Sequence, residues 1–190
     1  RRLNLSSYAP LRYVLPHRQA AYDSKYSTQI RGGESFFRQV DREESLIHLL
    51  RVNVLKRMES SVNSFALTVR RQLRDVEAML ARIEDHEPEL EEIDIDDVDF
   101  DDPNFEPLLV GRKVKVLLGD VDLIRWKQDL IEDRNRLATL CAAAEQVGAQ
   151  RDAKLAALRE LIQKKCESPT NPDNRKVIVF TAFADTATYL

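Results

Sequence analysis

The residues of this sequence with the clearest potential for chemistry are cations spaced along a predicted helix. Arg70, Arg71 and Arg74 lie within five residues, and Lys56 and Arg57 precede them by several helical turns. Guanidinium groups in this pattern can contact phosphates. The alternative is an ordinary solvated helix face, on which the cations face carboxylates three or four residues away. Both interpretations of Arg70, Arg71 and Arg74 stay open.

A second candidate is the turn formed by Thr181, Ala182 and Phe183, which directly follows the apolar run Val177–Phe180. The backbone N–H groups of a strand-to-helix turn suit a phosphate, so these three residues are candidate nucleic-acid contacts. The competing interpretation is that Thr181 caps a short helix beginning at Ala182, with Asp185 in its first turn.

Motifs for a self-contained active site are absent from the sequence. It has no G-x-x-x-x-G-K-S/T phosphate loop, no G-x-S-x-G elbow and no H-E-x-x-H zinc motif. The three histidines, His17, His48 and His86, match no zinc spacing. Cys141 and Cys166 fall within helical patterns and have no companion ligand, which favours a reduced, cytoplasmic chain. We therefore expect no catalytic residue and no metal ligand.

Charge is distributed unevenly along the chain. Thirteen of its 32 acidic residues lie between Glu84 and Glu106, where there is no Lys or Arg, whereas the chain carries 29 Lys and Arg in total. The segment 84–107 is therefore predicted to be a solvated acidic loop. The remaining residues are net basic and could accept a polyanionic partner. No apolar run approaches the ~20 residues that a membrane span requires.

Strong helical periodicity begins near Asp41. Apolar residues recur with a mean spacing of 3.6 residues from Ile47 to Ile83, and no Gly or Pro interrupts this stretch. The pattern predicts one helix of ~43 residues, about 65 Å long at 1.5 Å per residue. A group of small polar residues in its middle favours a close helix contact or a polar contact. These residues are Ser60, Ser61, Asn63, Ser64 and Thr68.

Two further helices are predicted after the acidic segment and a short strand at Val114–Leu118. The first runs to about Val147, is capped by Asp120 or Asp122, and carries Trp126 on its apolar stripe, where core packing is favoured over a base-stacking role. The second runs from Asp152 to about Lys165. We expect the long helix to pack antiparallel to the 122–147 helix.

The apolar run Val177–Phe180 predicts a strand buried on both faces of a parallel sheet, because its four residues are all apolar and mostly β-branched. Such a strand needs neighbours on both sides. The expected fold is therefore mainly α, a long antiparallel helical hairpin or bundle with little β, plus the first strand and helix of an incomplete α/β lobe.

Three stretches resemble superfamily 2 DNA helicases and translocases of the bacterial Swi/Snf type, similar to RapA. KVIVFTAFADTA, from Lys176, is similar to helicase motif IV and its preceding strand. REESLIHLLRVNVLKRMESSVNSFALTV, from Arg42, resembles the helical region between the two RecA-like lobes. GRKVKVLLGDVDLIRWKQDLIEDRNRL, from Gly111, is similar to the next stretch of those proteins, directly after that helical region. The resemblance covers most of residues 41–190.

The resemblance implies a piece of a larger ATP-dependent motor. It implies an irregular lead-in at 1–40, a helical inter-lobe region at 41–168 and the start of the second RecA-like lobe at 169–190. ATP and Mg²⁺ would bind elsewhere in the parent protein, which would contact DNA, so this chain alone would be inactive. A protein partner on the helical arm is also expected. The alternative function is a non-enzymatic helical scaffold or protein-interaction module.

Overall fold

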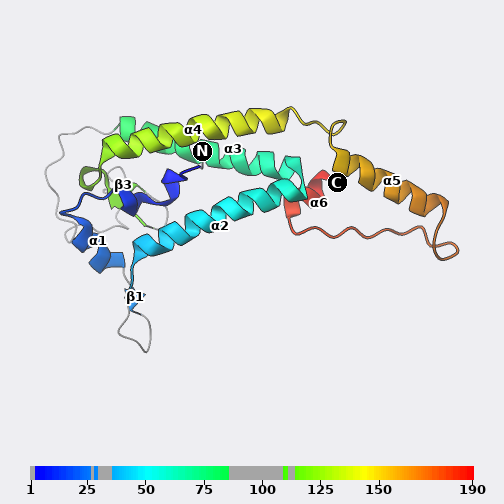
Figure 1. Cartoon of the computed structure of the whole chain (residues 1–190), viewed down its shortest axis with the longest axis horizontal. Helices are drawn as coiled ribbons and strands as arrows, with labels where there is room; N and C mark the ends of the chain where they lie inside the picture. Colours follow the sequence, from blue (N-terminus) through cyan, green and yellow to red (C-terminus); the bar gives the residue numbers. More distant parts are fainter. Residues whose placement is uncertain (1–2, 27, 30–35, 86–108, 111–113) are drawn as a thin grey trace. The chain divides into compact units, whose positions relative to one another are not determined.

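The computed structural model describes residues 3–26, 28–29, 36–85, 109–110 and 114–190, and over these residues the chain is mainly helical (Figure 1). The described helices are α1 (Gln19–Tyr26), α2 (Gln39–Ser60), α3 (Val62–Glu84), α4 (Leu123–Glu145), α5 (Ala153–Glu167) and α6 (Ala184–Tyr189). Two antiparallel pairs of two-residue strands join β1 (Thr28–Gln29) to β2 (Phe36–Phe37) and β3 (Leu109–Val110) to β4 (Val116–Leu117). The predicted mainly α fold with little β is confirmed.

The chain divides into two compact units. The first takes in the described residues of Arg1–Arg51 and Gln72–Leu137, and the second consists of Val52–Arg71 and Ala138–Leu190. Helices α2, α3 and α4 contribute residues to both. Among the described residues, no helix is both long enough and apolar enough to cross a bilayer.

The prediction of one uninterrupted helix from Asp41 to Ile83 is wrong, because the helix breaks at Ser61 and the chain changes direction there (Figure 1). The Ser61 hydroxyl accepts the N–H of Ser64 at 3.0 Å, as a residue capping α3 does. Serine is a weak helix former in a helix interior but a favoured N-cap. The apolar period continues across the break, so periodicity alone does not reveal it.

Trp126 of α4 is at the centre of the first unit and is fully buried. Its indole N–H donates to the carbonyl of Ser6 at 3.1 Å, and its ring stacks on Tyr13 with 5.4 Å between centroids. These contacts confirm Trp126 as a core residue. They also draw the N-terminal segment onto α4, although the sequence of that segment has no regular period.

A buried carboxylate fixes the same N-terminal segment. Asp133 of α4 has no solvent exposure and accepts three hydrogen bonds, from the N–H of Asn4 at 2.7 Å and from the N–H and hydroxyl of Ser6 at 2.8 Å each. Between these residues, Leu5 adopts a left-handed backbone with φ of 55°. A buried carboxyl group is tolerated when its oxygens are hydrogen-bonded, and both oxygens of Asp133 accept hydrogen bonds.

The two aspartates proposed as caps of the helix after the acidic segment have different roles. Asp122 is the cap of α4, since it accepts the N–H of Arg125 at 3.0 Å. Asp120 instead accepts the Arg18 guanidinium at 2.7 Å and the Tyr22 hydroxyl at 2.8 Å. The short strand predicted at Val114–Leu118 is present only as β4.

In the second unit, Asp152 caps α5 as predicted, accepting the N–H groups of Lys154 at 3.1 Å and Leu155 at 3.0 Å. The predicted buried strand at Val177–Phe180 is wrong. The segment forms no strand, and its exposed fractions are 42% for Val177, 77% for Ile178, 44% for Val179 and 91% for Phe180. A strand requires a neighbour to bond with its backbone, and no described strand lies beside this segment.

Candidate binding cavity of the second unit

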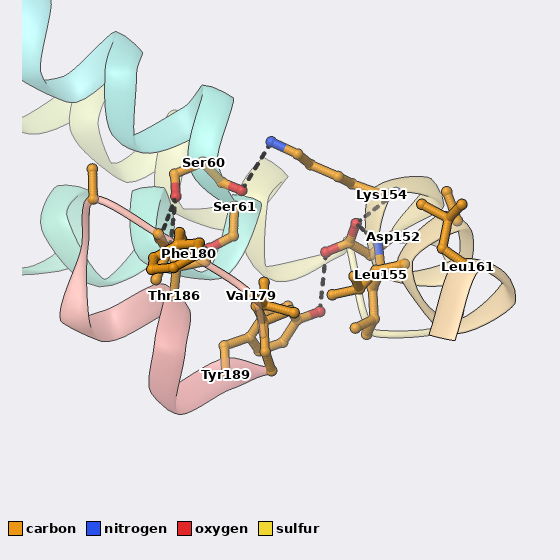
Figure 2. Close-up of a pocket in the computed structure, with 15 residues that line it drawn as sticks. Ser60, Ser61, Asp152, Lys154, Leu155, Leu161, Val179, Phe180, Thr186 and Tyr189 are labelled. Atoms are coloured by element: carbon orange, nitrogen blue, oxygen red, sulfur yellow. Dashed lines mark hydrogen bonds between the residues drawn. The ribbon is translucent and has the colours of Figure 1, made fainter. Parts of the chain in front are cut away.

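The second unit contains a cavity of about 440 Å³. Its walls come from the bend at Ser60 and Ser61, from α5 with its cap Asp152, and from the C-terminal segment including α6 (Figure 2). This volume falls in the range of small ligand sites in proteins. Because all of its walls belong to one unit, the cavity is a feature of that unit alone.

One side of the cavity is apolar. Leu155, Leu158 and Leu161 line it at intervals of three residues along α5, so they share one helical face. Val179 and Phe180 line it from the extended segment. Leu161 is 65% exposed, so this face of α5 is left only partly covered by the chain.

The polar end of the cavity is formed by Asp152, Lys154 and Tyr189 (Figure 2). One Asp152 oxygen caps α5, and the other accepts the Tyr189 hydroxyl at 3.1 Å. Desolvation, followed by this hydrogen bond, raises the pKa of Tyr189 above its ordinary value. The Lys154 ammonium donates to the carbonyls of Glu59 and Ser60, at the C-terminal end of α2. A cation at this position complements the free carbonyls of a helix end.

A group of hydroxyls holds α6 against the bend. The Thr186 hydroxyl is 2.9 Å from that of Ser60 and 3.2 Å from that of Ser61. The Thr181 hydroxyl lies 3.4 Å from that of Ser60. Thr186 itself is buried, so these bonds satisfy a polar group that water does not reach. They confirm the expected polar contact at the small polar residues.

An arginine next to the cavity provides a second attachment for α6. Arg57 forms an ion pair with Asp185 at 2.6 Å, and its guanidinium lies 4.8 Å from the centroid of the Phe183 ring. Cation–π contacts at this distance are attractive. Arg57, predicted as part of a basic patch, therefore makes a specific contact with the C-terminal segment.

The structure brings the candidate residues Thr181 and Ala182 to the cavity wall, with Phe183 beside them under Arg57. Thr181 does not cap a helix that begins at Ala182, because α6 begins at Ala184 and its N-cap residue is Phe183. The Thr181 hydroxyl instead accepts the N–H of Phe183 at 3.3 Å. Their proposed contact with nucleic acid stays a prediction.

The candidate phosphate contacts all lie on α3. Arg70 forms an ion pair with Glu145, which raises the pKa of the Arg70 guanidinium. Arg71 is exposed and belongs with Arg70 to the second unit, whereas the exposed Arg74 belongs to the first. Their contact with phosphate stays a prediction.

Metal-binding chemistry finds no support among the described residues, which hold no group of three or more His, Cys, Asp or Glu placed to ligate an ion. His17 and His48 are exposed, while His86 and most of the predicted acidic loop fall outside the described residues. Both cysteines are free thiols, and that of Cys141 donates to Glu145 at 3.2 Å.

Sequence reasoning missed Lys154, Thr186 and Tyr189 as cavity residues. Lys154 and Tyr189 meet Asp152 and the bend only after α5 and α6 have packed, so no local pattern reveals them. A partial signal existed for Thr186, because the unusual serines at Ser60 and Ser61 required a polar partner. No protein-family model, curated protein or solved structure matches this chain.

Proposed function

We propose that this chain is a helical, non-catalytic section of an ATP-dependent DNA helicase or translocase of superfamily 2, working in the cytoplasm. The observation that carries the proposal is the segment Val177–Phe180. It resembles the strand before helicase motif IV, and it is an apolar, extended segment exposed to water without a strand partner among the described residues. A fully buried Val, Ile or Phe side chain is worth roughly 1.5–3 kcal/mol relative to an exposed one.

Insertion of Val177–Phe180 into the sheet of a motor lobe would bury these apolar side chains. It would also give their backbone N–H and C=O groups hydrogen-bond partners. Thr181, Ala182 and Phe183 would then lie at the end of a sheet strand, where strand-to-helix turns commonly meet ligands. ATP and Mg²⁺ would be held by other parts of the motor, because this sequence has no phosphate loop. In this proposal the helices position the motor and the DNA without contributing to hydrolysis.

A second candidate function, a non-enzymatic protein-interaction module, is favoured by apolar side chains exposed on α2. Within the second unit, Val52, Leu55 and Met58 are each about half exposed. Exposed apolar residues that lie close together are a common mark of protein contact surfaces. An interaction module would explain the exposed apolar side chains of α2, but it would not explain the resemblance of Lys176–Ala187 to a helicase strand and motif.

The test compares two isoleucines with nearly equal exposure, Ile178 at 77% and Ile124 at 76%. The natural-length product of the gene that encodes this chain is purified as wild type, Ile178→Asp and Ile124→Asp. DNA-stimulated ATP hydrolysis is then measured for each. We expect Ile178→Asp to lose at least ~10-fold in rate, since a carboxylate would be buried in the sheet, and Ile124→Asp to keep the wild-type rate.

Two results would overturn the proposal. One is a natural-length wild-type protein that hydrolyses no ATP with or without DNA, which would favour the interaction module. The other is equal hydrolysis by both variants, which would place Val177–Phe180 outside the motor sheet.

A further inference from the structure

A groove runs between the segment Val177–Phe180 and α5. The cavity described above lies at the bottom of this groove. Val179 and Phe180 line the cavity from one side, and Leu155, Leu158 and Leu161 line it from the other (Figure 2). The segment alternates in exposure: Val177 and Val179 are less exposed than Ile178 and Phe180. This alternation is the two-residue period of an extended chain with one face turned toward its own unit.

The backbone of this segment has no partner in the part of the chain that the structure describes. The N–H and C=O groups of Val177–Phe180 make no hydrogen bond with other described residues, although the segment is extended. An extended backbone with free donors and acceptors is a template for another strand. The same groove therefore offers a line of backbone bonds and an apolar hollow for side chains.

We propose that the groove binds an extended peptide of a partner protein by strand addition, with apolar side chains at alternate positions entering the cavity. A small molecule could fill the cavity but would leave the backbone of Val177–Phe180 unbonded. A helix could cover the leucines of α5 but has no free backbone groups along its length. An extended peptide can hydrogen-bond with the backbone of Val177–Phe180 and also place side chains in the cavity, as in other strand-addition sites.

Charge at one end of the groove specifies the peptide further. Arg175 lies beside Cys166, whose thiol is 3.8 Å from the Arg175 carbonyl, so the start of the segment meets the end of α5. Residues 164–167 and 173–176 carry four cations and two acidic residues, Glu167 and Asp173. The cations are Lys164, Lys165, Arg175 and Lys176. The peptide is accordingly expected to carry a carboxylate at this end.

Strand addition and insertion into a motor sheet are alternative uses of the backbone of Val177–Phe180, and the test of strand addition involves neither DNA nor ATP, so its failure is distinct from failure of the helicase proposal. A phage library of random dodecapeptides is selected against the purified 190-residue chain. Ala156 and Ala157 provide a matched pair, since both are exposed residues of α5 but only Ala157 lines the cavity. Ala157→Trp fills the cavity, whereas Ala156→Trp adds the same side chain outside it.

Selected peptides are synthesised and their Kd values measured by fluorescence anisotropy, with circular dichroism to confirm that both variants fold. We expect micromolar binding, apolar residues at alternate positions and an acidic end. Ala157→Trp should weaken binding at least ~10-fold and Ala156→Trp less than ~2-fold. Methylation of alternate peptide nitrogens should also abolish binding, because it removes the backbone donors.

Several results would overturn the inference. These are failure to select any peptide that discriminates the two variants, equal binding of the methylated peptide, and selection of helical peptides. Light scattering provides a further test: if the chain alone forms a dimer that Ala157→Trp dissociates, a second copy occupies the groove and the partner peptide is excluded.

Discussion

Glu43 of α2 offers the sharpest test of the energetics of the first unit. Its side chain is 4% exposed; one carboxyl oxygen accepts the N–H of Leu11 at 3.2 Å, and the other has no hydrogen-bond partner in the described structure. Desolvation by burial raises the pKa of Glu43 to about 8, although the Leu11 N–H and the charge of Arg12 act in the opposite direction. The folded protein therefore holds a proton here that the unfolded chain releases near pH 4.5.

The difference between the folded and unfolded pKa of Glu43 sets how strongly, and in which direction, the free energy of unfolding depends on pH. Because the pKa of Glu43 is raised in the folded protein, the contribution of Glu43 to the stability of the fold is fully present below pH 4.5 and is lost as pH rises through about 8. Each pKa unit corresponds to about 1.4 kcal/mol, so Glu43 can lower the free energy of unfolding by at most about 5 kcal/mol over that range. Glu43→Gln keeps the shape and the acceptor for Leu11 but cannot ionise.

The assay is urea unfolding at pH 5, 7 and 9, followed by circular dichroism, for wild type, Glu43→Gln and Glu44→Gln. Glu44 is an exposed neighbour on the same helix and serves as the matched control. We expect the stability of Glu43→Gln relative to wild type to rise by several kcal/mol from pH 5 to pH 9, and that of Glu44→Gln to change little. Desolvation by burial and, to a smaller extent, the charge of Glu43 raise the pKa of Tyr26, which therefore stays neutral in this range.

A difference between Glu43→Gln and wild type that does not change with pH would refute the reasoning. It would mean that the Glu43 carboxyl is ionised when folded and therefore reaches water or an additional donor.

Three other substitutions test the contacts that hold each unit. Asp133→Ala leaves the N–H groups of Asn4 and Ser6 without an acceptor, and should lower the free energy of unfolding by ~3–5 kcal/mol in chemical denaturation, whereas the exposed Glu132→Ala should cost under ~1 kcal/mol. Thr186→Val removes the hydroxyl shared with the bend and should speed amide exchange in α6, while Thr186→Ser restores protection; equal protection in both would show that the hydroxyl bonds do not hold α6. Ser61→Ala should cost at least ~1 kcal/mol by removing both the cap of α3 and the contact with Thr186, and Ser61→Thr, which keeps a hydroxyl, should cost less; a neutral Ser61→Ala would argue against capping at the bend.

Local interactions are the features that sequence reasoning recovered well. The sequence predicts Asp152 as a helix cap and gives Asp122 as one of two candidate caps, with Asp120, because a cap depends on the few residues after it. Trp126 was placed in the core because its position on the apolar stripe is set by helical geometry alone. The bend at Ser61 is also local, but it was missed because the apolar period runs through it without a Gly or Pro.

Features that depend on distant residues were mispredicted or missed. Val177–Phe180 has the composition of a buried strand, but a strand exists only where another backbone accepts its bonds, and composition does not reveal that neighbour. The segment before α1 has little periodicity, yet Asp133 and Trp126, over a hundred residues away, fix its conformation. The cavity likewise exists only after α5 and α6 meet the bend. The sequence alone thus determined where most helical residues lie and that Asp152 is a cap, because these interactions span a few residues. Tertiary structure decided which backbones and carboxylates meet, because their partners lie far apart along the chain.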